Sequence, residues 1–195
     1  MPTSALANPL VLPILGLLAE RPRHAYALFS ELRSRYAYLG VRNATVYTLL
    51  NALVEAGWLR PRPGSSDRQE FLLTSSGCRA LAARVEHELQ DGDLADRTAF
   101  LTALAYLGIL APAAAAAALQ NRAGRIQHEE ARLTRALDEA AGIPELHMIE
   151  TRFYRDQLHH ERTWLDATIQ RIRSGALAWL SSDNGSGDGR YSAAR

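Results

Sequence analysis

The sequence contains no lysine. All 22 of its basic residues are arginine, and they face 21 acidic residues, so the net charge of +1 gives no indication of a charged partner. Cysteine is nearly absent as well, because Cys78 is the single one, which excludes an internal disulfide framework and any cysteine-based zinc or iron–sulfur cluster. We expect Cys78 to be a small buried side chain within a helix.

Uninterrupted hydrophobic runs are also scarce. The first ten residues carry no basic group, and Pro13 interrupts the apolar run over residues 10–19, which argues against a signal peptide. Residues 100–119 are uncharged over the length of a membrane span, but they are rich in alanine and contain Pro112. Because proline fits the first turn of a helix, the stretch predicts two soluble helices that meet there. We therefore expect a cytoplasmic protein that makes no contact with a membrane.

Patterns typical of enzymes and metal sites are missing too. The sequence has no nucleophile elbow and no glycine loop with a phosphate-binding lysine. His159 and His160 are adjacent, so on a helix they point about 100° apart and cannot share an ion. These absences predict a protein that is not an enzyme and that holds no cofactor or metal.

The residues that are present divide the chain into three parts. Residues 9–90 combine short helical patterns with one hairpin-like stretch, residues 94–174 are helical in pattern throughout, and residues 181–195 are polar and rich in glycine. With 47% apolar residues, the chain has enough material for a packed core. We predict a mainly α-helical protein with domains at 9–90 and 94–180 and a disordered tail at 181–195.

The first part has the element order of a winged helix-turn-helix. Its apolar periodicity predicts four helices, at residues 10–19, 24–36, 43–56 and 74–89. Residues 58–73 hold two strand-like segments around a Pro-Gly-Ser-Ser-Asp turn, which predicts a two-stranded wing. Asn43 and Thr74 are the expected N-caps of the third and fourth helices. In the second helix the apolar side is expected to consist of Tyr26, Leu28, Phe29 and Leu32.

The third helix has two contrasting faces. The core face follows the i, i+3, i+4, i+7 pattern and consists of Val46, Leu49, Leu50 and Leu53. The opposite face is small and hydrogen-bonding, with Ala44, Thr48, Asn51 and Glu55 flanked by Thr45 and Tyr47. Residues 33–84 contain eight arginines against three acids, so 8 − 3 leaves a local excess of +5. Such a basic region is typical of a domain that reads DNA.

Specific motifs resemble a known family. Residues 15–19, 24–28, 43–50 and 68–74 resemble the winged-helix domain of PadR-type transcriptional regulators. Residues 100–137, together with Ile149-Glu150 and residues 161–175, resemble the helical C-terminal dimerisation domain of the same family, so the resemblance covers about residues 9–180. The chain departs from the family pattern at Ala25 and Ala44, where the family usually has glycine, and at Gln69 and Glu70 in the second wing strand.

The resemblance implies a homodimeric repressor that binds an inverted-repeat operator in double-stranded DNA. It also implies release by a small aromatic or drug-like effector that enters the dimer. Independently, one short recognition helix reads only a few base pairs, so useful specificity requires two half-sites and a dimer. The alternative is a winged-helix module that binds partner proteins through the same face without engaging DNA specifically.

The expected DNA contacts lie on the third helix and on the wing. They are Arg42, Asn43, Thr45, Tyr47, Thr48 and Asn51 on the helix and Arg60, Arg62 and Arg68 on the wing. For Asn43 the alternative is helix capping, for Tyr47 packing against the second helix, and for the wing arginines solvated charge. Three other arginines, Arg23, Arg33 and Arg35, are expected to be ordinary surface charges.

The helical second part contains candidate interface residues. Leu119, Ile126 and Leu133 recur every seven residues. The last helix carries two apolar stripes, a first stripe of Leu146, Ile149, Phe153, His160 and Trp164 and a second stripe of Tyr154, Leu158, Leu165, Ile169 and Ile172. A helix that is apolar on two faces needs cover on both sides, which its own chain and a partner chain can supply. The alternative is a monomeric helical bundle.

From these patterns the expected dimer interface comprises Leu119, Ile126, Leu133, Leu158, Trp164, Leu165, Ile169 and Ile172. An effector pocket near this interface is expected among Phe100, Tyr106, Phe153, His160 and Trp164, with a plain hydrophobic core as the alternative.

Overall fold

The computed structural model describes residues 3–63 and 68–179, and the predicted tail at 181–195 lies outside this range. The chain forms two compact units. In the described range, the first contains the chain up to Val85 together with Arg97–Leu107, and the second contains Glu86–Asp96 and the chain from Gly108. Among the described residues, no helix combines the length and the apolar character that a membrane span requires.

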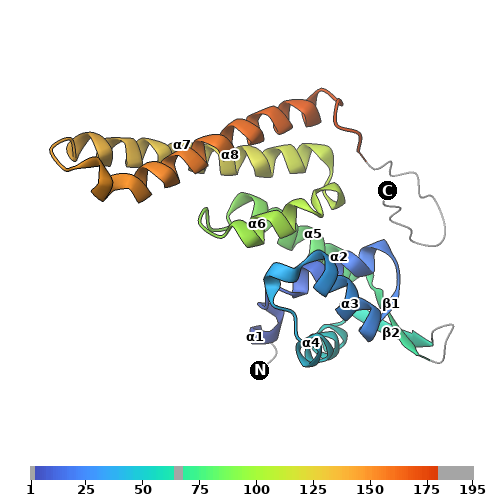
Figure 1. Cartoon of the computed structure of the whole chain (residues 1–195). Helices are drawn as coiled ribbons and strands as arrows, with labels where there is room; N and C mark the ends of the chain where they lie inside the picture. Colours follow the sequence, from blue (N-terminus) through green and yellow to red (C-terminus); the bar gives the residue numbers. More distant parts are fainter. Residues whose placement is uncertain (1–2, 64–67, 180–195) are drawn as a thin grey trace. The chain divides into compact units, whose positions relative to one another are not determined.

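The fold is mainly α-helical, as predicted, and most expected elements are present (Figure 1). The helices of the first unit are α1 (Thr3–Leu6), α2 (Val11–Glu20), α3 (Ala25–Arg35), η1 (Ala37–Leu39), α4 (Asn43–Glu55) and α6 (Arg97–Leu104). Helix α5 (Ser75–Gln90) begins in this unit and runs into the second, and η2 (Leu107–Ile109) follows α6. Thr74 caps α5 as expected, because its Oγ1 accepts a hydrogen bond of 3.1 Å from the amide of Gly77.

A small antiparallel sheet completes the first unit. The strands β2 (Leu59–Pro63) and β3 (Gln69–Leu73) form the predicted wing, and β1 (Arg23–His24) adds a third strand on the other side of β3. The expectation of a two-stranded ribbon was therefore incomplete. A strand of two residues is too short to give a period-two pattern, which explains why sequence periodicity missed it.

The core of the first unit is formed by α2, α3 and α4. Leu28 and Leu32 of α3 are buried as expected, and so are all four core residues of α4. Tyr26, expected on the apolar side of α3, is 60% exposed, so that assignment was wrong. Cys78 is exposed rather than buried. Partial desolvation still raises the pKa of its thiol, which leaves less reactive thiolate at neutral pH.

Tyr106 fixes the chain after α6 to the rest of the first unit. Its hydroxyl group accepts a hydrogen bond of 2.6 Å from the hydroxyl of Tyr36, and both side chains are buried. Its ring lies so close to Gly16 of α2 that a Cβ there would stand 2.1 Å from a ring carbon. Helix α6 therefore belongs to the first unit. The sequence instead predicts a domain boundary at residues 90–94, which would place α6 in the second domain, and that boundary stays a prediction.

The second unit is built on a long helical hairpin. Helix α7 (Pro112–Glu139) begins at Pro112 as predicted, and it lies beside α8 (Ile149–Arg173), with η3 (Glu145–Met148) before α8 (Figure 1). The three residues that recur every seven positions and all members of the second stripe except Tyr154, which is half-buried, are buried within the chain: Leu119, Ile126, Leu133, Leu158, Leu165, Ile169 and Ile172. Of the expected interface residues, only Trp164 remains exposed, because α7 and α8 pack their leucines and isoleucines within one chain.

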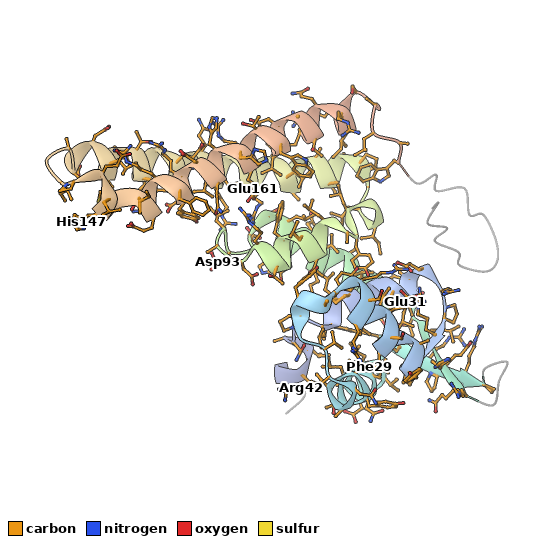
Figure 2. All side chains as sticks on the ribbon, in the orientation of Figure 1. Phe29, Glu31, Arg42, Asp93, His147 and Glu161 are labelled. Atoms are coloured by element: carbon orange, nitrogen blue, oxygen red, sulfur yellow. The ribbon has the colours of Figure 1, made fainter. Side chains whose placement is uncertain are left out.

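A buried ion pair crosses this hairpin. The guanidinium group of Arg122 on α7 is fully buried, and its Nε donates to Oε1 of Glu161 on α8 at 2.7 Å. Figure 2 labels Glu161. Arg125, also on α7, donates to the carbonyl oxygens of Gln90 and Gly92, each at 2.9 Å. Arg125 therefore satisfies backbone carbonyls at the end of α5, where a helix leaves its last acceptors without partners.

Candidate nucleic-acid interface

Helix α4 offers an exposed N-terminal end. Its N-cap position is Arg42, whose backbone is extended (φ −111°, ψ 140°) and whose side chain makes no capping hydrogen bond. Asn43 is therefore the first helical residue and not the cap, which corrects the capping interpretation. The guanidinium of Arg42 is exposed at the start of the helix, where Figure 2 labels it.

The outer face of α4 carries the side chains that the sequence analysis selected. Asn43, Thr48 and Asn51 are exposed, and Thr45 is half-buried. Tyr47 is 48% exposed, so it does not have the burial that packing against α3 would require. The hydroxyl group of Thr48 donates to the carbonyl oxygen of Ala44 at 3.0 Å, which leaves its oxygen as an acceptor for an outside donor.

The wing has one buried and one exposed face. Leu59 and Phe71 are buried, and because side chains alternate along a strand, Arg60 and Arg62 point to the opposite face. Both arginines are exposed, as is Arg68 just before β3. The structure thus places all three wing arginines in solvent.

Glu70 of β3 shares the exposed face with the wing arginines. It stands directly across from Arg62 in the strand register, and its Oε2 accepts hydrogen bonds from Nε and Nη2 of Arg62 at 3.2 and 3.1 Å. The sequence analysis treated Arg62 as a free cation and missed this pair. The hairpin register would have revealed it, since residues opposite each other on neighbouring strands share a face.

Several arginines counted toward the local basic excess have structural partners. Arg35 pairs with Glu20 at 2.6 Å and with Glu31 at 3.0 Å, and both acids lie outside the segment in which charges were counted. Arg84 donates to the carbonyl oxygen of Leu6 at 2.6 Å. The count of +5 therefore overstates the positive charge that a ligand would meet.

Like Arg35, the other two arginines expected to be surface charges make specific contacts, and only Arg23 is buried. Arg23 is buried, donates to the carbonyl oxygen of Leu17 at 3.2 Å and pairs with Glu20 at 2.7 Å, so the surface assignment was wrong for it. The guanidinium carbon of Arg33 lies 5.5 Å from the ring centre of Phe29, which is the geometry of a cation–π contact.

The residues expected around an effector are divided between the two units. Phe100 and Tyr106 belong to the first unit and are buried there. Burial is the main cause that raises the pKa of Tyr106 above its ordinary value. Phe153, His160 and Trp164 lie on α8 in the second unit, and all three are exposed.

Together these elements define the class of the first unit: helices α2, α3 and α4, with the β2–β3 wing, form a winged helix-turn-helix domain of the DNA-binding type. The model of the transcriptional regulator PadR-like family matches residues 14–83. The resemblance to PadR-type regulators is thereby confirmed over the winged helix, which is the part of the chain that this family model matches. That family model describes transcriptional regulators.

Several solved structures of PadR-type regulators align with the chain at low sequence identity. A PadR-like transcriptional regulator from Bacillus cereus is 13% identical, with 85% of this chain and 98% of that chain covered and a TM-score of 0.38. PadR of Bacillus subtilis in complex with operator DNA is 16% identical (84% and 98% covered, TM-score 0.36). The same protein in complex with p-coumaric acid is also 16% identical (85% and 96% covered, TM-score 0.39). No curated protein matches the chain.

Proposed function

We propose that the protein is a homodimeric transcriptional repressor that binds an inverted-repeat operator and leaves it when a small aromatic molecule binds. One observation carries the DNA-binding part of this proposal. The outer face of α4 presents hydrogen-bonding side chains at the exposed end of a helix whose other face is fully buried, within a domain that matches a family of transcriptional regulators.

The roles follow from side-chain chemistry. Asn51 and Thr48 hydrogen-bond base edges in the major groove, and the Tyr47 hydroxyl donates to a phosphate oxygen. Arg42 binds a phosphate or a guanine edge at the start of α4. The wing supplies charge next to the groove, where Arg60 and Arg68 bind phosphates or enter the minor groove. Asn43 and Thr45 complete the contact surface near the first turn.

The dimer is proposed from the two stripes of α8. Because α7 covers the second stripe, the first stripe is left as a row of large exposed side chains, among which Phe153 is 63% exposed. Contiguous exposed apolar surface of this kind typically marks a protein–protein contact, and a second copy of α8 offers the same apolar surface. A dimer would set the distance between two α4 helices at about 34–36 Å, one turn of DNA, or at a multiple of it.

The proposed effector site lies on the outer face of α8. Phe153, His160 and Trp164 combine aromatic surface with polar groups on one helix, which suits a planar aromatic ligand. A ligand that favours a different spacing of the two α4 helices lowers operator affinity by at most its differential affinity for the two states. Phe100 and Tyr106 could line such a site only after leaving their buried positions.

The test is a titration of the purified protein with a DNA fragment from immediately upstream of its own gene, with an unrelated fragment of equal length as reference. We expect nanomolar binding to the first fragment and a linear fall of log affinity with log salt. Arg42→Ala and Tyr47→Ala should weaken binding, whereas Arg135→Ala, which removes an equal charge from exposed α7 surface, should not.

The outcomes separate the proposal from its alternative. Equal, salt-sensitive affinity for both fragments would show a basic winged helix without this operator. No binding at low salt would contradict the DNA-binding proposal and favour a module that binds partner proteins. Loss of the dimer in the Arg42→Ala variant would contradict the division of roles between α4 and α8.

A further inference from the structure

The exposed face of the wing contains a charge pair between Arg62 and Glu70, on the same face as Arg60. Arg60 and Arg62 lie two residues apart on β2 and share this face, and Glu70 on β3 lies opposite Arg62. Among residues 3–63 and 68–179, no ion pair involves Arg60, whereas Arg62 gives two guanidinium hydrogen bonds to one oxygen of Glu70. On the same strand, the Arg62 guanidinium is therefore paired with a carboxylate within the chain, and the Arg60 guanidinium has no such ion pair among the described residues.

The carboxylate of Glu70 resembles the ligand that Arg62 would bind on DNA. A carboxylate and a phosphate both present anionic oxygens to the planar guanidinium donors, so they compete for the same N–H groups. On the other side of Glu70 lies His24 of β1, which is in register with it. The Nδ1 atom of His24 accepts a hydrogen bond of 3.1 Å from the amide of Ala27. Within the described residues, the contact partner of the Glu70 carboxylate is Arg62.

We propose that Glu70 is an intramolecular competitor of DNA: its carboxylate holds the Arg62 guanidinium that would otherwise bind a phosphate, and so it limits the affinity of the wing for DNA of any sequence. This inference rests on the proposed DNA-binding function. Arg62 can give its Nε and Nη2 donors together to a phosphate only after these donors leave Glu70. Arg60 binds without this cost.

The pair contributes little to the folded state, which makes the proposal separable from a structural role. Both side chains are partly exposed, and exposed ion pairs are screened by water and salt. The isosteric variant Glu70→Gln removes the charge and keeps the size of the side chain. It is expected to fold like the parent protein, with an unchanged thermal midpoint and unchanged circular dichroism.

The experiment is a double-mutant cycle on DNA affinity, measured by fluorescence anisotropy with the upstream fragment and with an unrelated duplex. We expect Glu70→Gln to bind both duplexes about fivefold more tightly, equivalent to about 1 kcal/mol. The ratio of the two affinities should stay unchanged, because phosphate contacts carry no sequence information. The gain should shrink as the salt concentration rises.

The second half of the cycle assigns the effect to Arg62. In an Arg62→Gln background, Glu70→Gln should give less than a twofold gain, whereas in an Arg60→Gln background the fivefold gain should persist. An equal gain in both backgrounds would overturn the proposal, since Glu70 would then act only through its general charge. An unchanged or weaker affinity of the Glu70→Gln variant would overturn it as well.

Failure of the proposed function has a different signature. If neither the parent protein nor the Glu70→Gln variant binds either duplex at low salt, both the DNA-binding function and this inference are wrong. If the parent binds DNA and the variant binds no more tightly, only the inference about Glu70 is wrong. If the parent does not bind and the variant does, with the gain lost in the Arg62→Gln background, the competition is supported directly.

Discussion

Helices α4 and α8 share the same inner design and differ in what they show to the outside. Each buries a row of leucine, isoleucine or valine side chains, so the inner faces are nearly interchangeable in composition. The outer face of α4 is made of small hydrogen-bonding groups together with Tyr47. The outer face of α8 presents the first stripe, whose members Phe153 and Trp164 are large and exposed.

The difference indicates two kinds of partner. A hydrogen-bonding face remains solvated until it meets a surface that supplies donors and acceptors, as the edges of base pairs do. An apolar face gains from any cover that removes it from water, at about 25 cal/mol for each Å² of apolar surface buried. The inner faces account for the fold, and the outer faces distinguish the helix that we propose reads DNA from the helix that we propose binds a second copy of the chain.

The largest effect is expected on the inner face of α8. Leu165 is fully buried, so Leu165→Ala should lower the free energy of unfolding by about 2–5 kcal/mol. The adjacent Trp164 is 45% exposed, and Trp164→Ala should have a much smaller effect on the stability of the single chain. Urea unfolding followed by circular dichroism measures both. Equal losses for the two neighbours would remove the distinction between the faces.

The next effect concerns the outer face of α8. Phe153→Arg should place a charge in the proposed dimer contact and weaken association by about 2–4 kcal/mol, as for a central interface residue. Gln170→Arg, which adds the same charge on another side of the same helix, should leave the dimer intact. Sedimentation velocity at micromolar protein measures the fraction of dimer. A parent protein that is monomeric there would contradict the proposed use of the first stripe.

A third prediction concerns α4, where a change on the outer face should affect DNA binding and a change on the inner face should affect stability. Asn51→Ala should weaken binding to the preferred DNA by about 1–3 kcal/mol and leave the free energy of unfolding within ~0.5 kcal/mol of the parent. Leu50→Ala on the inner face should do the reverse by destabilising the domain. Anisotropy titrations and thermal unfolding of the two variants test this exchange. An Asn51→Ala variant that is destabilised but binds DNA normally would place Asn51 in the core.

The smallest effect is a pH dependence of the domain that carries α4. Burial raises the pKa values of Tyr36 and Tyr106, so above pH 10 the unfolded chain loses these protons while the folded chain keeps them. Stability is therefore fully present below pH 10 and falls above it, and Tyr106, whose pKa is raised most, contributes a fall of about 1.4 kcal/mol per pH unit. Tyr106→Phe should flatten this fall, and the exposed control Tyr26→Phe should not. Urea unfolding between pH 9 and 11 gives the slopes, and equal slopes for the two variants would contradict the burial argument.

Periodicity predicted most of the fold because the apolar residues of a long amphipathic helix recur at a regular spacing that can be read from the sequence. The four core residues of α4 and the start of α7 at Pro112 were found from spacing and proline chemistry alone. The partner of a charge could not be found in this way. Arg23 and Arg122 look like any other arginine in the sequence, and their burial depends on carboxylates that the folded chain brings to them.

The same reasoning explains the errors at the site and at the interface. Asn43 has the chemistry of an N-cap, but the backbone makes Arg42 the cap residue, a shift of one position that composition does not determine. The stripe through Leu119 and Ile126 has the spacing of a coiled coil, and that spacing does not tell whether the facing helix belongs to the same chain. Here α8 of the same chain provides the contact.

The position of Cys78 has a practical consequence for spectroscopy. Its thiol is the only one in the chain and lies exposed on α5, close in sequence to the wing and outside the outer faces of α4 and α8. A spin label or a fluorophore attached there would report on the winged-helix domain without any engineered residue. In a dimer the distance between the two labels would report the distance between the two winged-helix domains. Measured with and without DNA or a candidate effector, that distance would show whether the spacing of the two domains changes.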